Sequence, residues 1–131
     1  MRPDLTQGAP LCGLKVLVVE DEMLIAIDIE DILRRGGAQV LGPVPTVRQG
    51  LHLLQTEPLD VALLDVHLRD GLVTRLAEAL RSRSIPYVVS TAYNEADLAG
   101  IEVLADVPKV GKPAREQHLV VALAKAANLT P

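Results

Sequence analysis

The sequence has few of the residues on which several common functions depend. It contains no tryptophan, no phenylalanine and only two tyrosines, so it lacks the aromatic side chains that stack on nucleic-acid bases or flat cofactors. A single cysteine, Cys12, excludes an internal disulfide and fits a reducing compartment. No apolar run reaches the ~18 residues needed to span a bilayer, and the first residues lack the apolar core of a secretion signal. We therefore expect a cytoplasmic protein that does not bind membranes.

The overall charge is also unsuited to nucleic acid. The formal net charge is −4 at pH 7, whereas a nucleic-acid surface needs a basic face. Hydrophobic residues make up 49% of the 131 residues, which is enough for the core of one compact domain. Residues 1–13 hold proline, glycine and polar residues, and we expect a flexible tail there, followed by one domain over residues 14–131.

Short apolar runs alternate with amphipathic segments along the chain. The runs are rich in valine and mostly lack an apolar/polar alternation, which is typical of strands buried on both faces of a parallel sheet. The expected strands are Leu14–Val19, Ala38–Leu41, Val61–Leu64, Tyr87–Ser90 and Val107–Val110. The segments between them predict helices, with Thr46 as a cap, Gly36-Gly37 as a stop and a weakly patterned helix around Glu95–Leu104. Because crossovers between parallel strands are right-handed, this order predicts a doubly wound (βα)5 α/β fold with a five-stranded parallel sheet.

Polar side chains follow the ends of these strands, where ligands bind in open parallel sheets. They are Glu20, Asp21 and Glu22 after the first strand, Asp65 after the third, Ser90 and Thr91 at the fourth, and Lys112 after the fifth. Clustered carboxylates suit a hard divalent cation such as Mg²⁺. Asp65 can then act as a nucleophile toward phosphorus, with the cation, Lys112 and the hydroxyl of Thr91 neutralising the product. We expect Glu22 to point outward and to favour the positive end of the next helix.

These motifs resemble the receiver domain of two-component response regulators, of the single-domain type. The resemblance is carried by LVVEDE, LLDVHL, STA and KP, each at an expected strand end and in the family's order. It covers about Leu14 to Asn128 and implies the flavodoxin-like receiver fold. It also implies a protein that signals by phosphorylation-dependent contact with a downstream target protein.

The resemblance implies a role for each matching residue. Asp65 would accept a phosphoryl group from a sensor histidine kinase or phosphotransfer protein, so the chain would catalyse its own Mg²⁺-dependent phosphorylation and dephosphorylation without being a classical enzyme. The groups that would bind Mg²⁺ are Glu20, Asp21, Asp65 and the backbone carbonyl of His67. Thr91 and Lys112 would hold the phosphoryl group, and the peptide bond before Pro113 would be cis.

The sequence departs from the family's pattern in two places. The interval from Asp65 to Thr91 is shorter than usual, which predicts a shortened helix or lead-in between them. Lys109 stands where most receivers carry an aromatic residue that rotates inward on activation. A lysine cannot follow an apolar burial route without losing its charge or its water, so we expect this switch to be absent and Lys109 to be solvated or to contact a partner. These departures resemble a branch of stand-alone receivers, some of which work with stress-signalling kinases.

Other functions stay open at this point. A phosphorylation-independent interaction module with the same fold is favoured by Lys109 and opposed by the retained acceptor-site residues. An aspartate-nucleophile phosphatase is opposed because the chain has no room for a substrate cap. A flavin carrier is opposed because the chain lacks aromatic stacking residues. For a phosphorylation-dependent switch we expect target contact through the helix around Glu95–Leu104, the fifth strand and the last helix. Exposed Val103 or Leu104 would support that surface, and Arg69 and Asp70 are expected to be loop charges.

Overall fold

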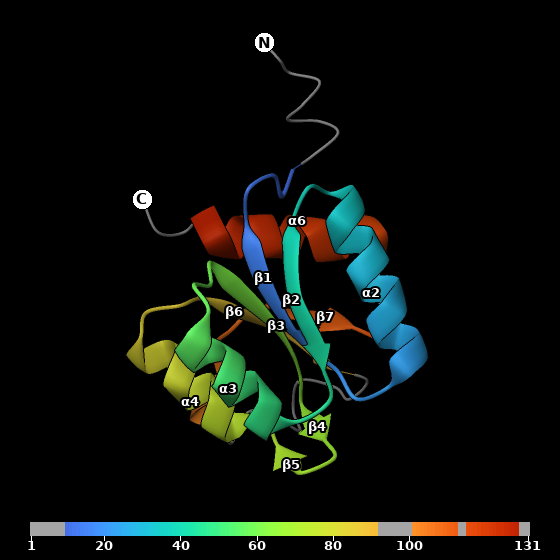
Figure 1. Ribbon diagram of the computed structural model, residues 1–131. Coiled ribbons are helices and arrows are strands. Elements are labelled where there is room, and N and C mark those ends of the chain that lie inside the picture. The colour runs from blue at the N-terminus through green and yellow to red at the C-terminus, as the bar shows by residue number, and fades with distance from the viewer. Residues whose placement is uncertain (1–9, 92–100, 113–114, 129–131) are drawn as a thin grey trace.

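The computed structural model describes residues 10–91, 101–112 and 115–128. Figure 1 shows a central sheet with helices on both of its faces. Five parallel strands form the sheet in the order β2-β1-β3-β6-β7. Their bounds are β1 Lys15–Val19, β2 Gln39–Val44, β3 Val61–Asp65, β6 Tyr87–Thr91 and β7 Lys109–Gly111. The predicted doubly wound α/β fold is confirmed.

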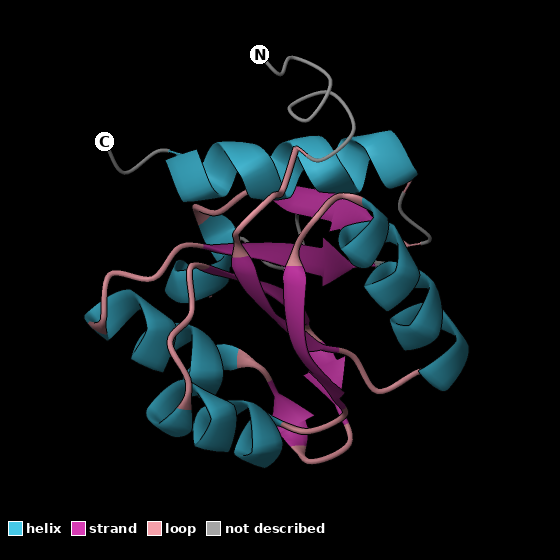
Figure 2. Ribbon diagram, turned by 45° about the horizontal axis from the view of Figure 1, so that its top comes forward, coloured by secondary structure: helices cyan, strands magenta, loops and turns pink. Residues whose placement is uncertain are grey.

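The helices are divided between the two faces of the sheet (Figures 1 and 2). One face carries α2 (Met23–Arg35) and α6 (Glu116–Asn128), and the other carries α3 (Val47–Thr56), α4 (Thr74–Ser82) and α5 (Glu102–Ala105). The expected helix signals are present at two ends. The side chain of Thr46 accepts a hydrogen bond from the backbone N–H of Gln49 at 3.1 Å, and α2 ends at Gly36.

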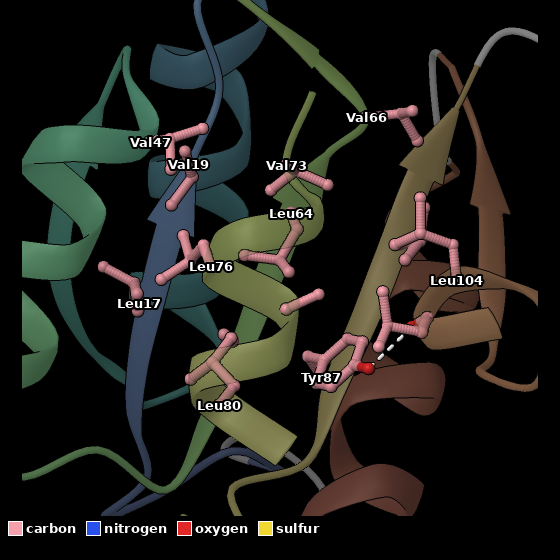
Figure 3. Close-up of a cluster of buried hydrophobic side chains, with 14 of the residues drawn as sticks. Leu17, Val19, Val47, Leu64, Val66, Val73, Leu76, Leu80, Tyr87 and Leu104 are labelled. Atoms are coloured by element: carbon pink, nitrogen blue, oxygen red, sulfur yellow. Dashed lines mark hydrogen bonds between the residues drawn. The ribbon is translucent and has the colours of Figure 1, made fainter. Parts of the chain in front are cut away.

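Two separate apolar layers explain why the strands lack alternation. Within β1, Leu17 and Val19 face α3 and α4, whereas Val16 and Val18 face α2 and α6. Each of these four side chains is 1% exposed or less, so both faces of the strand are core. Figure 3 shows the first layer, in which β1 side chains lie across from those of α4 and β6.

The edge strand β2 runs further than predicted. It continues through Gly42 and Pro43, and its pairing with β1 shifts register between Leu17 and Val19. Proline is tolerated there because an edge strand leaves one side of its backbone unpaired. Gly42 has φ +97°, and a Cβ at this position would lie 2.8 Å from the carbonyl oxygen of Val18. The irregular backbone therefore needs glycine, which an apolar-run criterion does not detect.

Two short strands between β3 and α4 were not predicted. β4 (His67–Leu68) and β5 (Gly71–Leu72) pair antiparallel and form a small hairpin whose turn is Arg69–Asp70. Figure 1 shows this hairpin beside the end of α3. The segment between Asp65 and α4 is therefore a hairpin, and α4 itself has 9 residues.

The expected target-binding surface is not supported at its centre. The helix expected around Glu95–Leu104 lies partly outside the described residues, and its described part is the single turn α5. Val103 is 8% exposed and Leu104 is fully buried, so the exposed apolar side chain that would have supported this surface is not found at either position. Both pack in the layer that contains Tyr87, whose hydroxyl donates to the Val103 carbonyl at 2.6 Å (Figure 3).

Leu11 lies within the stretch that we expected to be a loose tail, yet it is fully buried. Its backbone N–H donates to the carbonyl of Gly36 at 2.8 Å, just after α2. Packing in the described chain therefore begins before residue 14. Among the described helices, none combines the length and the apolar character needed to cross a bilayer.

Candidate functional site

The acidic side chains at the ends of β1 and β3 come together. These strands are neighbours at the centre of the sheet. The helix after β1 lies on one face of the sheet and the helix after β3 lies on the other face. Open α/β sheets form a crevice between two such strands. Glu20, Asp21 and Asp65 each place a carboxylate oxygen within 4.8 Å of the others. Three predicted site residues thus meet at one point of the sheet edge.

Glu20 is the most buried member of this cluster. It is 3% exposed, and its backbone N–H donates to the carbonyl of Val44 at 2.9 Å, which fixes it beside the end of β2. Its Oε2 atom accepts hydrogen bonds from the N–H of Glu22 at 3.1 Å and from Lys112 Nζ at 3.2 Å. Its Oε1 atom is also 3.2 Å from Lys112 Nζ, but the angle is unsuitable and this buried oxygen has no hydrogen-bond partner among the described residues.

Lys112 joins the two buried carboxylates from the end of β7. Its Nζ atom lies 3.2 Å from Asp65 Oδ1 and 3.2 Å from Glu20 Oε1, and its side chain is 11% exposed. Burial lowers the pKa of Lys112, but the charges of Asp65 and Glu20 outweigh this and raise the pKa above its ordinary value. Lys112 is therefore charged and close to the carboxylate of Asp65.

Asp65 is held in an environment that disfavours its charge. Burial raises the pKa of Asp65 to about 7 with help from the negative charge of Glu20, and Lys112 opposes this rise. The pocket thus holds three carboxylates and one ammonium group, which contacts two of them, so an excess of negative charge remains. The Glu20 oxygen that accepts no hydrogen bond and the all-oxygen donor set fit a hard divalent cation such as Mg²⁺.

The remaining predicted site residues lie around this cluster. Thr91 is 7% exposed at the end of β6, where it pairs with Gly111, and its neighbour Ser90 pairs with Asp65. Ser90 and Lys112 line a small groove between α2 and α6. His67 begins β4 and is exposed. The peptide bond predicted to be cis involves Pro113, which lies outside the described residues.

Sequence reasoning missed the contacts of Asp70 and Lys109. The two Asp70 carboxylate oxygens accept hydrogen bonds from the backbone N–H groups of Val47 and Arg48, at 2.9 and 3.1 Å. Lys109 Nζ donates to the carbonyls of Ala105 and Val107 at 2.9 and 3.0 Å, so its amine is held at the end of α5. Both contacts bridge separate elements and have no local sequence signal, although Asp is a common partner of helix N-termini.

The fold is that of a doubly wound α/β protein with an acidic pocket at the carboxyl ends of its strands. The sequence profile described as "Response regulator receiver domain" matches residues 16–124. The chain therefore belongs to the response regulator receiver domain family, whose members act in two-component signalling.

Known proteins similar to this chain carry the same domain. The transcriptional regulatory protein PdtaR of Mycobacterium tuberculosis is 33% identical over 86 residues, which are 64% of this chain and 42% of that protein. The sensory transduction protein LytT of Bacillus anthracis is 33% identical over 115 residues, 86% of this chain and 46% of that protein. This chain thus spans less than half the length of these curated relatives. The solved receiver domain of PhyR from Erythrobacter litoralis superposes with a TM-score of 0.79 at 26% identity, over 90% of this chain and 92% of that one.

Proposed function

We propose that Asp65 is the phosphoacceptor of this receiver domain and that its phosphorylation controls contact with a downstream target protein. The phosphodonor would be a phosphohistidine of a sensor histidine kinase or of a phosphotransfer protein, and the exchange would take place in the cytoplasm. One observation carries the proposal: the Asp65 carboxylate lies 3.2 Å from Lys112 Nζ in a pocket that also holds the carboxylates of Glu20 and Asp21.

The reaction is a transfer of one phosphoryl group between two nucleophiles. A carboxylate oxygen of Asp65 attacks the phosphorus, an O–P bond forms as the N–P bond breaks, and the imidazole leaves with the electron pair. Lys112 stays charged beside Asp65 and binds one oxygen of the transferred group. The hydroxyl of Thr91 would donate to another oxygen from the end of β6.

The same pocket supports a role for Mg²⁺. Glu20, Asp21, Asp65 and the backbone carbonyl of His67 would hold the ion, and the buried Glu20 oxygen that accepts no hydrogen bond supports this assignment. When bound, Mg²⁺ supplies positive charge for the phosphoryl oxygens and orients them for transfer. Glu20 and Lys112 would preorganise the pocket before the phosphodonor binds, because Lys112 Nζ already donates a hydrogen bond to Glu20 Oε2.

Intact-mass spectrometry with acetyl phosphate as phosphodonor tests the proposal. The native chain with Mg²⁺ should gain the mass of one phosphoryl group, and the Asp65→Ala variant should gain none. Asp28→Ala is a matched control, because Asp28 is an exposed carboxylate that lines the groove beside Lys112. A mass gain that persists in Asp65→Ala, or one that does not need Mg²⁺, would contradict the proposal.

A phosphorylation-independent interaction module is the second candidate. It is favoured by Lys109, whose amine is held by backbone carbonyls of α5 and the following loop in place of the family's mobile aromatic side chain. This candidate predicts that beryllofluoride with Mg²⁺ leaves the backbone amide NMR signals unchanged outside the pocket. The phosphorylation-dependent switch instead predicts small changes that extend into the segment after β6.

A further inference from the structure

A polar groove lies between α3, β5 and α4, and it is separate from the phosphorylation pocket. Its volume is about 480 Å³, and no residue proposed to bind Mg²⁺ or the phosphoryl group lines it. The side chains that determine its character are those of Arg48, His52, Asp70, Leu72 and Arg75. The groove therefore brings together basic groups from two helices and residues of the β4–β5 hairpin.

The hairpin gives this groove a fixed wall. Asp70 binds the N-terminal N–H groups of α3, at Val47 and Arg48, and Thr46 caps the next one, at Gln49. These backbone hydrogen bonds hold the pKa of Asp70 below its usual range. The one acidic side chain that lines the groove is thus held by hydrogen bonds to the helix backbone. Its charge also interacts with that of Arg48, which is a weaker effect than the backbone hydrogen bonds.

The basic side chains of the groove differ from those of α2. Arg34 and Arg35 of α2 form ion pairs at 2.8 and 3.0 Å with carboxylates one turn away. Within the described residues, neither Arg48 nor Arg75 has a carboxylate within ion-pair distance, which is 4.0 Å. Both are exposed, in a protein whose net charge is −4. The groove is therefore a local basic site on an acidic protein.

An apolar side chain lies among these charges. Leu72 is 44% exposed at the wall of the groove, although the large hydrophobic residues of α4 behind it are fully buried. Half-buried Leu51 of α3 adds a second apolar contact. A small inorganic anion makes no apolar contact with these leucines. A peptide with acidic and aliphatic side chains can contact both the arginines and the leucines.

We propose that this groove, defined by Arg48, His52, Leu72 and Arg75, binds an acidic, leucine-containing segment of a partner protein. Carboxylates of that segment pair with Arg48 and Arg75, and an aliphatic side chain covers Leu72. The surface differs from the expected one around Val103 and Leu104, whose side chains are buried. Binding here does not require phosphorylation of Asp65, so the inference goes beyond the proposed phosphotransfer.

NMR titration of the uniformly ¹⁵N-labelled chain tests this inference without any phosphodonor. The probe is a short synthetic peptide that alternates glutamate and leucine. We expect saturable shifts of the backbone amides of α3 and of residues 70–75. The double variant Arg48→Glu/Arg75→Glu should weaken the apparent affinity at least about tenfold, because it reverses both cations of the groove.

Two further variants separate a built groove from general charge attraction. Arg115→Glu/Lys125→Glu changes the net charge equally at two exposed positions, one just before α6 and one within it, and it should leave the affinity within about twofold. Leu72→Ser should weaken binding by about threefold, and it should not unfold the chain because this leucine is already 44% exposed and lies outside the buried core.

Three outcomes would overturn the proposal. The first is an α6 double variant that weakens binding as much as the groove variant does. The second is inorganic pyrophosphate that shifts the same amides with equal affinity, which would make the groove a small-anion site. The third is a groove signal that changes with protein concentration in the absence of peptide, which would make the partner a second copy of this chain. Each leaves the phosphorylation of Asp65 untouched.

Discussion

Lys109 begins the edge strand β7 and Lys112 follows its last residue, but the two amines contact different kinds of group. Lys112 faces carboxylates, with its Nζ atom 3.2 Å from oxygens of both Glu20 and Asp65. Lys109 faces neutral backbone, donating to the carbonyls of Ala105 and Val107. A lysine at the end of a helix satisfies carbonyls that the helix leaves unpaired, which is a structural contribution. A lysine among buried carboxylates only partly balances their negative charge, which leaves an excess of negative charge in the pocket.

Two aspartates show the same contrast. Burial and the charge of Glu20 raise the pKa of Asp65 to about 7, whereas backbone hydrogen bonds from α3 lower the pKa of Asp70. The charge of Asp70 is stabilised by the fold itself. The charge of Asp65 is disfavoured by the fold, so it depends on Lys112 and on what binds beside it. Of these four residues, the two whose charges face buried charges lie in the acidic pocket, and the two whose charges face backbone lie outside it.

The largest expected effect separates the two lysines. Lys112→Met should slow phosphorylation by acetyl phosphate at least about 100-fold, because it removes the cation that binds the phosphoryl oxygens. Lys109→Met should stay within about threefold of the native rate, since its amine is bonded to backbone away from Asp65. Time courses by intact-mass spectrometry measure both. Equal losses in the two variants would break the distinction between them.

The pH dependence of stability tests the cost of charging Asp65. The folded state binds a proton on the Asp65 carboxylate more tightly than the unfolded chain does, because folding raises the pKa of Asp65 from 3.8 to about 7. Without Mg²⁺, the free energy of unfolding should therefore fall as the pH rises from about 4 to about 7. Mg²⁺ should raise Tm at about pH 8 by at least ~3 °C more than at about pH 5.

The Asp65→Asn variant is the control for this measurement. It removes the titrating group, so its Tm without Mg²⁺ should change little over the same pH range. It should also lose most of the difference between the two pH values in the response to Mg²⁺. If Mg²⁺ shifts Tm equally at both pH values, the ion is not compensating the charge of Asp65.

A smaller effect is expected at Asp70. Asp70→Ala leaves the first N–H groups of α3 without their carboxylate and should lower Tm by about 2–4 °C. Hydrogen exchange should increase at the amides of Val47 and Arg48. Asp70→Asn, which keeps an acceptor oxygen, should recover part of the loss. Phosphorylation of Asp65 should proceed at close to the native rate, and a large decrease would show that the hairpin also shapes the pocket.

The smallest effect is expected for the stability of Lys109→Met. The variant loses two hydrogen bonds to the end of α5, a helix of one turn, so its Tm should fall by about 2 °C or less. Hydrogen exchange should increase only at residues 101–109. Faster exchange throughout β7 would mean that Lys109 supports the sheet as well as the helix.

The sequence was sufficient for the parts of the fold that depend on local patterns. Thr46 and Gly36 mark helix ends, and the valine-rich runs mark strands buried on both faces. β2 was predicted too short because its continuation depends on a register shift at Gly42, which follows from contact with β1. The β4–β5 hairpin has strands of two residues each, too short for any periodicity to show.

For the site, strand-end position was the useful signal. It brought Glu20, Asp21, Asp65 and Lys112 to one edge of the sheet, where the structure has them in contact or close together. The hydrogen bonds of Asp70 with α3 could not be predicted, because they join segments 22 and 23 residues apart without a local motif. The burial of Val103 and Leu104 depends on packing around Tyr87, which the weak helical pattern did not indicate.

Paramagnetic Mn²⁺ as a probe of the ¹⁵N-labelled chain tests the central claim most directly, namely that the carboxylates of Glu20, Asp21 and Asp65 form one divalent-cation site. At low Mn²⁺, the account predicts line broadening centred on the backbone amides of residues 19–22 and 65–67, reversed by excess Mg²⁺. Broadening centred on the exposed carboxylates of α2 instead, or no localised broadening, would contradict it.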